Sequence, residues 1–470
     1  MFAKIQQIHF VGIGGIGMSG IAEVLLNLGY KVSGSDLKSS GVTQRLAGLG
    51  AAVFEGHRTE NIAGAEVVVT SSAIASEIPE VVEALRMHVP VIQRAEMLAE
   101  LMRLKYGIAI AGMHGKTTTT SMVAAVLAGG GLDPTVVVGG RVDAMGSNAR
   151  LGKSQYLVAE ADESDRSFLK LSPILSVVTN IDREHMDCYR NMRDVKKTFL
   201  EFMDRVPFYG MVVVCNDDAM LRRLLPQAQR RTVTYGTKRG SDFLIRLANG
   251  AASAGVRAEG QPLSRFRVSY LKKDLGEFTL HVPGVHNILN ATAAIAVGVG
   301  LDISVDAIRL GLDQFRGVDR RFQLRGRTAG VSVIDDYGHH PTEIKATLAA
   351  ARQCGFRKVH VVFQPHRYTR TRDLIEDFAT AFENADSLFV LDIYAASEKP
   401  IEGISGEALA RAIRDKGGAS AQYVSSFAEA VDGAAGAAQD GDMILTLGAG
   451  SVSQLGPMIL QKLTEREGKA

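Results

Sequence analysis

Residues 108–120 restrict the possible folds more than any other segment. An apolar run, Ile108–Ile110, leads into a loop that reads Gly-Met-His-Gly-Lys-Thr, and a helical pattern follows. In a strand–loop–helix of this kind, backbone N–H groups surround phosphate oxygens, a lysine balances their charge and a hydroxyl ligates Mg²⁺. Ile110 stands where the usual, longer loop has its first glycine. An ordinary glycine turn would not need Lys116 and four threonines, so the segment predicts a nucleotide-binding α/β domain.

A second glycine loop lies near the start of the chain. The run Ile5–Val11 precedes Gly12-Ile13-Gly14-Gly15-Ile16-Gly17, and Asp36 closes the next strand. Gly-x-Gly-x-x-Gly between a strand and a helix places a diphosphate at the helix N-terminus. NAD, FAD and a UDP-sugar all satisfy this geometry, so the motif identifies a diphosphate and leaves the base open.

Composition sets wider limits. A chain of 470 residues is too long for one core and predicts two or three domains. The net charge of +2 gives no strong field for nucleic acid or an anionic membrane. The sequence has no apolar run of membrane-spanning length and no signal-peptide pattern. The three cysteines lack CxxC spacing. A cytoplasmic enzyme is expected.

Short apolar runs alternate with helical patterns almost throughout, which indicates parallel sheets with crossover helices. We predict an α/β protein of three domains: a Rossmann-like parallel sheet in residues 1–105, a P-loop-type ATP-binding domain in 106–322 and a second Rossmann-like domain in 323–470. Between Asp242 and Val282 the pattern alternates, which predicts antiparallel strands at a sheet edge.

Carboxylates follow the strand after the phosphate loop. Glu160 ends the run Tyr156–Ala159, where its side chain can reach a metal on a loop-bound nucleotide. For Asp162, Glu163 and Asp165 we favour a solvated acidic turn.

The next strand ends in Asn180-Ile181-Asp182-Arg183-Glu184-His185-Met186-Asp187. A lone histidine here is usually a capping or core residue. Beside Asp182, Asp187 and a nucleotide loop, His185 is equally a candidate metal ligand.

Two polar segments follow strands near the C-terminus, 335–343 and 364–371. Their Asp, His, Tyr and Arg side chains predict a pocket for a small zwitterion or carboxylate. Asp335 or Asp336 could instead cap the helix near Pro341. Asn287 and Asn290, after a Pro-Gly turn, suit either a base or a helix cap.

From end to end the chain resembles the Mur ligase family. The resemblance rests on the glycine loop at 12–20, on Gly112–Thr120 with its short spacing, and on Glu160-Ala161-Asp162-Glu163-Ser164-Asp165. It also rests on Thr179–Asp182, His185-Met186-Asp187, His286-Asn287, Asp335–Glu343, Phe363–Thr371 and Gly448-Ala449-Gly450-Ser451.

The resemblance implies ATP- and Mg²⁺-dependent ligation of L-alanine to the carboxylate of UDP-N-acetylmuramate, in peptidoglycan precursor synthesis. It assigns catalysis to Lys116, Glu160 and His185, and metal binding to Thr117, Glu160 and His185. ATP then contacts Gly112, Met113, His114, Gly115, Lys116, Thr117, Thr118, Asn287, Asn290, Arg321 and Asp336. UDP-sugar contacts Gly12, Gly14, Gly15, Ile16, Gly17, Asp36, Ser71 and Ser72. The amino acid contacts Tyr337, His339, Arg367 and Arg370.

Several relatives carry a carbamylated lysine after the His-Met-Asp element, and Lys196 or Lys197 lies in that neighbourhood without an assignment. A murein-peptide recycling ligase of the same family is the nearest alternative. An NAD(P)-dependent oxidoreductase, from another class, would explain the first loop but leave Lys116, Thr117 and Glu160 without a role.

Overall fold

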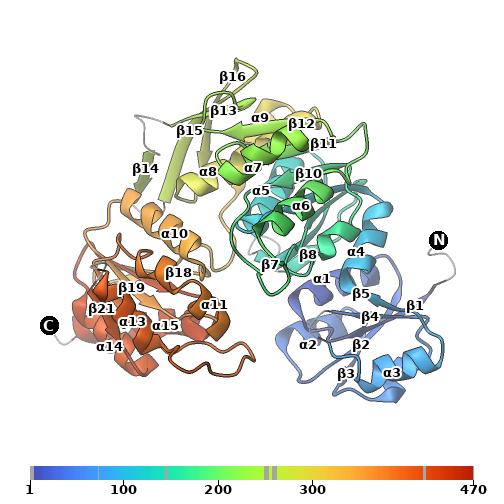
Figure 1. The fold of residues 1–470 in the computed structure, drawn as a ribbon, viewed down its shortest axis with the longest axis horizontal. Helices are drawn as coiled ribbons and strands as arrows, with labels where there is room; N and C mark the ends of the chain where they lie inside the picture. Colours follow the sequence, from blue (N-terminus) through green and yellow to red (C-terminus); the bar gives the residue numbers. More distant parts are fainter. Residues whose placement is uncertain are drawn as a thin grey trace. The chain divides into compact units, whose positions relative to one another are not determined.

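The computed structural model describes residues 5–71, 74–142, 147–247, 253–256, 262–416 and 420–468. These residues form three sheets with covering helices, labelled in Figure 1. The chain divides into two compact units: the first holds residues 1–246, 267–276 and 289–315, and the second holds 247–266, 277–288 and 316–470. The domain boundaries near 105 and 322 stay predictions.

The first sheet is parallel, as predicted. Its strands lie in the order β3 (Ala52–Glu55), β2 (Lys31–Asp36), β1 (Gln7–Val11), β4 (Val67–Thr70) and β5 (Val91–Gln93). The connections run through α1 (Ile16–Asn27), α2 (Gly41–Gly48), the short 3₁₀ helix η2 (Thr59–Ile62) and α3 (Pro79–Arg86), and α4 (Arg94–Arg103) follows β5. The order reverses beside β1, so the first glycine loop opens at the switch point where open α/β sheets bind ligands.

A carboxylate is enclosed within this first sheet and its helices. Glu80 of α3 has no exposed surface. It accepts hydrogen bonds from Ser35 Oγ at 2.8 Å, His57 Nδ1 at 2.9 Å and Asn61 Nδ2 at 2.7 Å, and His9 Nε2 lies 3.6 Å away. Burial by itself raises the pKa of Glu80, but the hydrogen bonds from His9, Asn61 and Ser35 outweigh it and lower the pKa.

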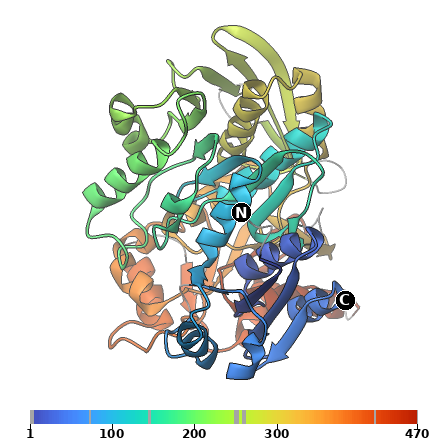
Figure 2. The same cartoon turned by 90° about the vertical axis from the view of Figure 1, so that its right-hand side faces the viewer.

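The second sheet contains the phosphate loop. Its strands run in the order β14 (Ser253–Val256), β15 (Pro262–Tyr270), β13 (Phe243–Leu247), β12 (Thr232–Gly236), β11 (Met211–Cys215), β10 (Leu175–Val178), β6 (Tyr106–Ala111), β9 (Tyr156–Glu160), β7 (Thr135–Val142) and β8 (Ser147–Arg150). A further strand, β16 (Lys273–Leu280), pairs with β15, and this hairpin is the long curved yellow-green ribbon in Figure 2. β14 pairs antiparallel with β15, which confirms the predicted antiparallel character.

The helices of this region are α5 (Lys116–Gly129), α6 (Met192–Met203), α7 (Ala219–Leu224), α8 (Val285–Gly300) and α9 (Val305–Gln314), with 3₁₀ turns η4 (Ser167–Lys170) and η5 (Leu225–Gln227). Helices α5 and α9 pack closely because they meet at glycines. A Cβ on Gly311 would lie 2.4 Å from the carbonyl oxygen of Ala125, and one on Gly129 would lie 2.5 Å from that of Ala307. This packing holds α5, the helix that follows the phosphate loop, against α9 in the first unit.

The third sheet has the order β17 (Gln323–Thr328), β18 (Val331–Asp336), β22 (Met443–Leu447), β19 (Val359–Phe363), β20 (Ser387–Val390) and β21 (Ser420–Tyr423). Only β17 is antiparallel to its neighbour. The helices are α10 (Pro341–Gln353), α11 (Tyr368–Asp373), α12 (Ile375–Ala379), α13 (Gly406–Asp415), α14 (Phe427–Ala437) and α15 (Leu455–Glu467), with a 3₁₀ turn η7 (Ser451–Gln454). Two separate apolar clusters confirm a Rossmann-like layered domain.

The alternative role of Asp335 or Asp336 as the cap of α10 is not what the structure has. His340, not Asp335 or Asp336, is the N-cap residue, and its ring nitrogen accepts from the backbone N–H of Thr342. Glu343 closes the capping box by accepting from the His340 backbone N–H. Both aspartates still lie within β18, too early in the chain to reach the helix start.

Among the helices of the described residues, none has the length and apolar character needed to cross a membrane.

We expect Glu80→Ala to destabilise the protein by about 3–5 kcal/mol. The substitution removes a buried carboxylate and leaves its buried hydrogen-bond partners, including His9 and His57, without an acceptor. The pKa of Glu80 is lowered in the folded state, so its stabilisation is complete above the ordinary value of 4.5 and is lost as the pH falls below it. Urea unfolding of the native and variant proteins at pH 7 and at pH 4 measures the loss of unfolding free energy and its dependence on pH. A deficit as large at pH 4 as at pH 7 would contradict the ionic role.

Candidate functional site

Two residues that follow β10 fix the backbone of the phosphate loop by hydrogen bonds. Thr179 Oγ1 and Asn180 Nδ2 both donate to the backbone oxygen of His114, at 2.7 and 2.9 Å, and Asn180 Oδ1 accepts from the His114 N–H at 2.8 Å. Gly112 has a φ of +135°, and a Cβ there would lie 2.0 Å from Thr179 Oγ1. Gly115, the N-cap of α5, has a φ of +81°. The loop therefore requires these two glycines.

Lys116 begins α5 and its ammonium group is surrounded by acceptors. Nζ donates to the backbone oxygens of Gly112 at 2.8 Å and Met113 at 3.2 Å, and to Glu163 Oε1 at 2.8 Å. Burial lowers the pKa of Lys116, but the negative charges of Glu163 and Glu160 outweigh it, so the pKa is raised. Lys116 is therefore firmly cationic.

Glu160 and Thr117 lie together, as a metal site on this loop requires. Thr117 Oγ1 donates to Glu160 Oε2 at 2.9 Å, and the N–H of Gly139 in β7 donates to the same oxygen at 2.7 Å. A Cβ on Gly139 would lie 2.9 Å from both carboxylate oxygens of Glu160. A hydroxyl and a carboxylate held side by side at a phosphate loop form an oxygen donor set that fits Mg²⁺.

The solvated acidic turn predicted for residues 162–165 is wrong for Glu163. Its side chain is buried, whereas Asp165 is exposed and Asp162 is partly exposed. Glu163 Oε1 lies 3.4 Å from His185 Nε2 in addition to its contact with Lys116. Burial lowers the pKa of His185, but Glu163 and Glu184 outweigh it and the pKa is raised. The tertiary fold thus brings His185 to the acidic segment, although the two lie on different strand ends.

Asp182 and Asp187, the two aspartates after β10, are placed differently from His185. Asp182 accepts from His114 Nε2 at 2.9 Å and from the N–H of Arg183. Asp187 is exposed. In the structure Asp182 therefore supports the phosphate loop through His114, and neither acid joins His185 in a cluster.

The first glycine loop is built around Asp36. Its Oδ2 accepts from the N–H of Gly14 at 2.9 Å and its Oδ1 from the N–H of Leu37 at 2.8 Å. Gly12 has a φ of +78°, and Gly15 is the N-cap of α1. Both oxygens of Asp36 therefore already hold backbone.

Arg94 lies against this loop. A Cβ on Gly17 would lie 2.5 Å from Arg94 Nη1, and Arg94 Nη2 donates to Asp162 Oδ2 at 2.9 Å. One guanidinium thus connects the start of α1 with the acidic segment after β9. Sequence analysis missed Arg94, whose position at the start of α4 carries no motif.

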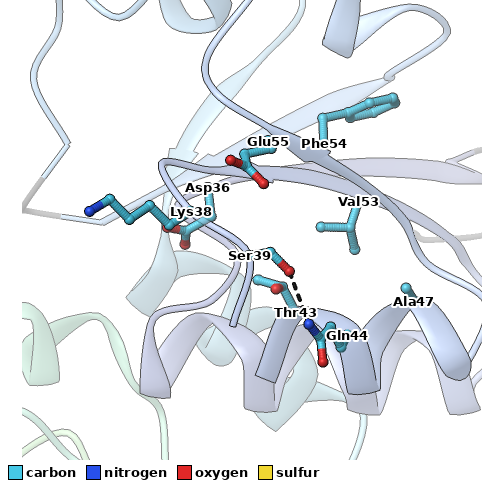
Figure 3. Close-up of a pocket in the computed structure, with 9 residues that line it drawn as sticks. All are labelled: Asp36, Lys38, Ser39, Thr43, Gln44, Ala47, Val53, Phe54 and Glu55. Carbon is cyan, nitrogen blue, oxygen red and sulfur yellow. Dashed lines mark hydrogen bonds between the residues drawn. The ribbon is translucent and has the colours of Figure 1, made fainter. Parts of the chain in front are cut away.

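A pocket of about 200 Å³ opens next to Asp36, between α2 and β3 (Figure 3). Polar side chains line one side, with Ser39 Oγ accepting from Gln44 Nε2 at 3.3 Å. Val53 and Phe54 contribute apolar surface. Of the predicted sugar-site residues, Ser71 is partly buried after β4, while Ser72 and the side chain of Ile16 lie outside the described residues.

The two asparagines of α8 lie in its first turns and both are buried. Asn287 Nδ2 donates to the backbone oxygen of Pro283 at 2.7 Å. Asn290 faces the phosphate loop, because a Cβ on Gly115 would lie 2.8 Å from Asn290 Oδ1. Asn290 thus lies beside the phosphate loop, whereas Asn287 stabilises the start of α8 by its hydrogen bond to Pro283.

In the second unit, Asp336 is buried at the end of β18. Its oxygens accept from the N–H groups of Phe322 and Gly338, each at 2.7 Å. Burial raises the pKa of Asp336 to about 6, although Arg321 opposes the rise. Arg321 itself lies 3.4 Å from Glu343 Oε1 and over the Tyr337 ring.

Four rings form a continuous row beside the ends of β18 and β19. Tyr337 meets His339 edge-on at 5.4 Å between centroids, His339 lies 5.6 Å from His366, and His366 stacks on Tyr394. Burial, followed by the charges of His339 and two arginines, lowers the pKa of His366 to about 3. His366 is therefore neutral at physiological pH.

The two predicted amino-acid arginines differ. Arg370 Nη1 contacts His366 at Nδ1 (3.1 Å) and at the backbone oxygen (3.3 Å). Arg367 is exposed, has a φ of +70°, and its guanidinium donates no hydrogen bond to another described residue. Thr369, in the same helix start, is fixed by Glu398, which accepts from both its N–H and its hydroxyl.

Three family models match the chain consecutively. They are the Mur ligase family, catalytic domain, over residues 7–106; the Mur ligase middle domain, over 110–298; and the Mur ligase, glutamate ligase domain, over 320–450.

Individual relatives agree with these models. A UDP-N-acetylmuramate–L-alanine ligase of Koribacter versatilis is 72% identical, covering 99% of both chains, and one of Geobacter sulfurreducens is 54% identical with the same coverage. The crystal structure of UDP-N-acetylmuramate–alanine ligase from Thermotoga maritima matches with a TM-score of 0.80 at 29% identity, covering 98% of this chain and 99% of that one. A murein peptide ligase from Psychrobacter arcticus matches with a TM-score of 0.68 at 24% identity, covering 97% and 98%, which shows the shared fold.

We expect Gly139→Ala to weaken divalent-cation binding about tenfold while leaving the fold intact, because the new methyl group must displace the Glu160 carboxylate. Titration with Mn²⁺ in the presence of ADP, followed by electron paramagnetic resonance, measures the affinity. Gly436→Ala, a helix position with nothing within 4 Å, is the matched control. Equal Mn²⁺ affinity in all three proteins would exclude Glu160 as a cation ligand.

Proposed function

The chain belongs to the Mur ligase family, and from this premise we propose that it joins L-alanine to the carboxylate of UDP-N-acetylmuramate, with cleavage of ATP to ADP and phosphate. The observation that carries the proposal is the 72% identity, over nearly the whole of both chains, to a relative named for this reaction. The lysine, threonine and carboxylate gathered at the phosphate loop support the same chemistry.

The reaction needs two steps because a carboxylate is a poor acylating agent at neutral pH. A carboxylate oxygen of the sugar attacks the γ-phosphorus of ATP, the bond to ADP breaks, and an acyl phosphate forms. The neutral amine of alanine then attacks the acyl carbon through a tetrahedral intermediate. Phosphate leaves, the amine loses its proton, and the amide remains.

The phosphate end of the site follows from the first unit. Backbone N–H groups at the N-terminus of α5 hold the phosphates, because those of Met113 and His114 are bonded to Asn180. Lys116 balances charge on the transferring group. Thr117 and Glu160 would hold a Mg²⁺ ion, and Glu160 with His185 would hold a second cation. Such cations would supply Lewis-acid stabilisation of the phosphoryl oxygens.

The UDP diphosphate occupies the N-terminus of α1, at Gly14, Gly15 and Gly17. Asp36 keeps the loop in shape by accepting the Gly14 N–H, and is not itself required to contact a ribose. Arg94 lies beside Gly17 and adds a positive charge where the diphosphate is expected. Ser71 and Ser72 remain proposed sugar contacts.

The second unit supplies the amino-acid end. Arg367 binds the alanine carboxylate, because its guanidinium donates no hydrogen bond to another described residue, whereas Arg370 contacts His366. Tyr337 and His339 lie near the amine.

For the nucleotide, Asn287 and Asn290 face the adenine, Asp336 faces the ribose and Arg321 faces the phosphates. Asp336 must share its oxygens with the backbone groups that it already accepts.

Phosphate release with purified protein, UDP-N-acetylmuramate, MgATP and an amino component tests the proposal first. L-Alanine should support turnover, and the tripeptide substrate of a recycling ligase should not. Family membership favours a ligase over the NAD(P)-dependent oxidoreductase. If the protein were such an oxidoreductase, adding it to NADH would change the NADH fluorescence, and UDP-sugar would not reverse that change by competition.

We expect Lys116→Ala to abolish turnover, with kcat lowered at least a hundredfold, because the lysine charge acts on the transferring phosphoryl group. Phosphate release measures kcat, and thermal unfolding reports the fold. Because Lys116 also neutralises buried Glu163, some loss of stability is expected too. A folded Lys116→Ala protein with near-normal kcat would refute the ATP site.

We expect Arg367→Lys to raise the KM for alanine about tenfold or more and to leave the KM for ATP and for the sugar nearly unchanged. A forked pair of hydrogen bonds to a carboxylate needs a guanidinium, and a lysine offers only a point charge. Arg372→Lys, an exposed neighbour paired with Asp373, is the control. If Arg367→Lys weakened ATP alone, this arginine would belong to the phosphate site.

A further inference from the structure

Glu163 is a buried carboxylate in contact with Lys116 and His185. Its side chain has no exposed surface, Oε1 lies 2.8 Å from Lys116 Nζ and 3.4 Å from His185 Nε2. Its other oxygen, Oε2, is buried and accepts no hydrogen bond from any described residue. The backbone is fixed as well, because Tyr189 donates its hydroxyl to the Glu163 carbonyl oxygen at 2.6 Å. The carboxylate is therefore rigidly placed with one oxygen in use and one available.

Lys116 has no hydrogen to spare in this arrangement. An ammonium has three donors, and here they go to Gly112 O, Met113 O and Glu163 Oε1. A nucleotide phosphate can gain Lys116 only if one of these contacts breaks. The carbonyl contacts are neutral, but releasing Glu163 would leave a buried carboxylate with its nearest full positive charge removed, which is strongly unfavourable.

We propose that Glu163 is a charge latch: it holds Lys116 away from the nucleotide until a divalent cation binds Oε2 beside His185 and takes over the negative charge. This inference rests on the proposed function, since it concerns the same phosphate loop. It makes Glu163 a positioning residue for Lys116 and an additional cation ligand. Tight nucleotide binding then depends on the cation through this chain's own side chains, and not only through the phosphates.

Binding of adenylyl imidodiphosphate, measured by calorimetry in EDTA and in Mg²⁺, tests the latch. In Glu163→Gln the amide keeps an acceptor for Lys116 but carries no charge, so metal-free affinity should rise about tenfold over the native protein. The gain in affinity on adding Mg²⁺ should shrink correspondingly. Asp165→Asn removes an exposed carboxylate from the same segment and should change neither quantity.

A second measurement uses the native protein alone and does not depend on the variant folding. Mg²⁺ without nucleotide should speed the labelling of Lys116 by an amine-reactive reagent, read by peptide mass spectrometry, because the latch is released. Unchanged labelling, or a folded Glu163→Gln whose metal-free affinity matches the native protein, would overturn the inference. Native protein that binds no nucleotide even with Mg²⁺ would instead refute the proposed function.

Discussion

The site depends on the balance of charge around the start of α5. The phosphate loop concentrates backbone N–H groups and one ammonium at a helix N-terminus, and with no anion bound that positive charge needs partners. The segment after β9 supplies them, with Glu163 on Lys116 and Glu160 on Thr117. Thr179 and Asn180, at the end of the neighbouring β10, then hold the loop backbone in place. Parallel strands make this possible, because their carboxyl ends meet at one edge.

The glycine loop of the first sheet also exposes backbone N–H groups at a helix N-terminus, but its motif contains no lysine. This loop also opens at the end of a central strand, but the acceptor is Asp36, which bonds directly to the Gly14 N–H. A positive charge beside this loop comes from Arg94, on another helix, and Arg94 is itself paired with Asp162 of the acidic segment. The two glycine loops thus differ in where their neighbouring positive charge comes from. In one loop it is part of the motif, and in the other the tertiary fold delivers it.

The second unit shows how burial adjusts polar groups of ordinary type. Asp336 and His366 both lie at strand ends, and burial favours the neutral form of each, raising the pKa of Asp336 to about 6 and lowering that of His366 to about 3. His366 is therefore neutral, and Arg367 and Arg370 are positive charges that act on it. Arg367, exposed at a strained φ of +70°, is the one best placed to meet an anionic ligand.

The sequence by itself determined the parallel sheets, both glycine loops and the pairing of Lys116 with Thr117, because strand–loop–helix patterns are local and the loop glycines have no substitutes. It also placed Glu160 at the end of a strand, where the structure has it as the last residue of β9, beside Thr117. Only the tertiary structure decided the rest. Glu163 was read as solvated because burial depends on His185 and Lys116, which are distant in sequence. Gly139 and Arg94 carry no motif, and their roles come from the side chains that the fold lays against them.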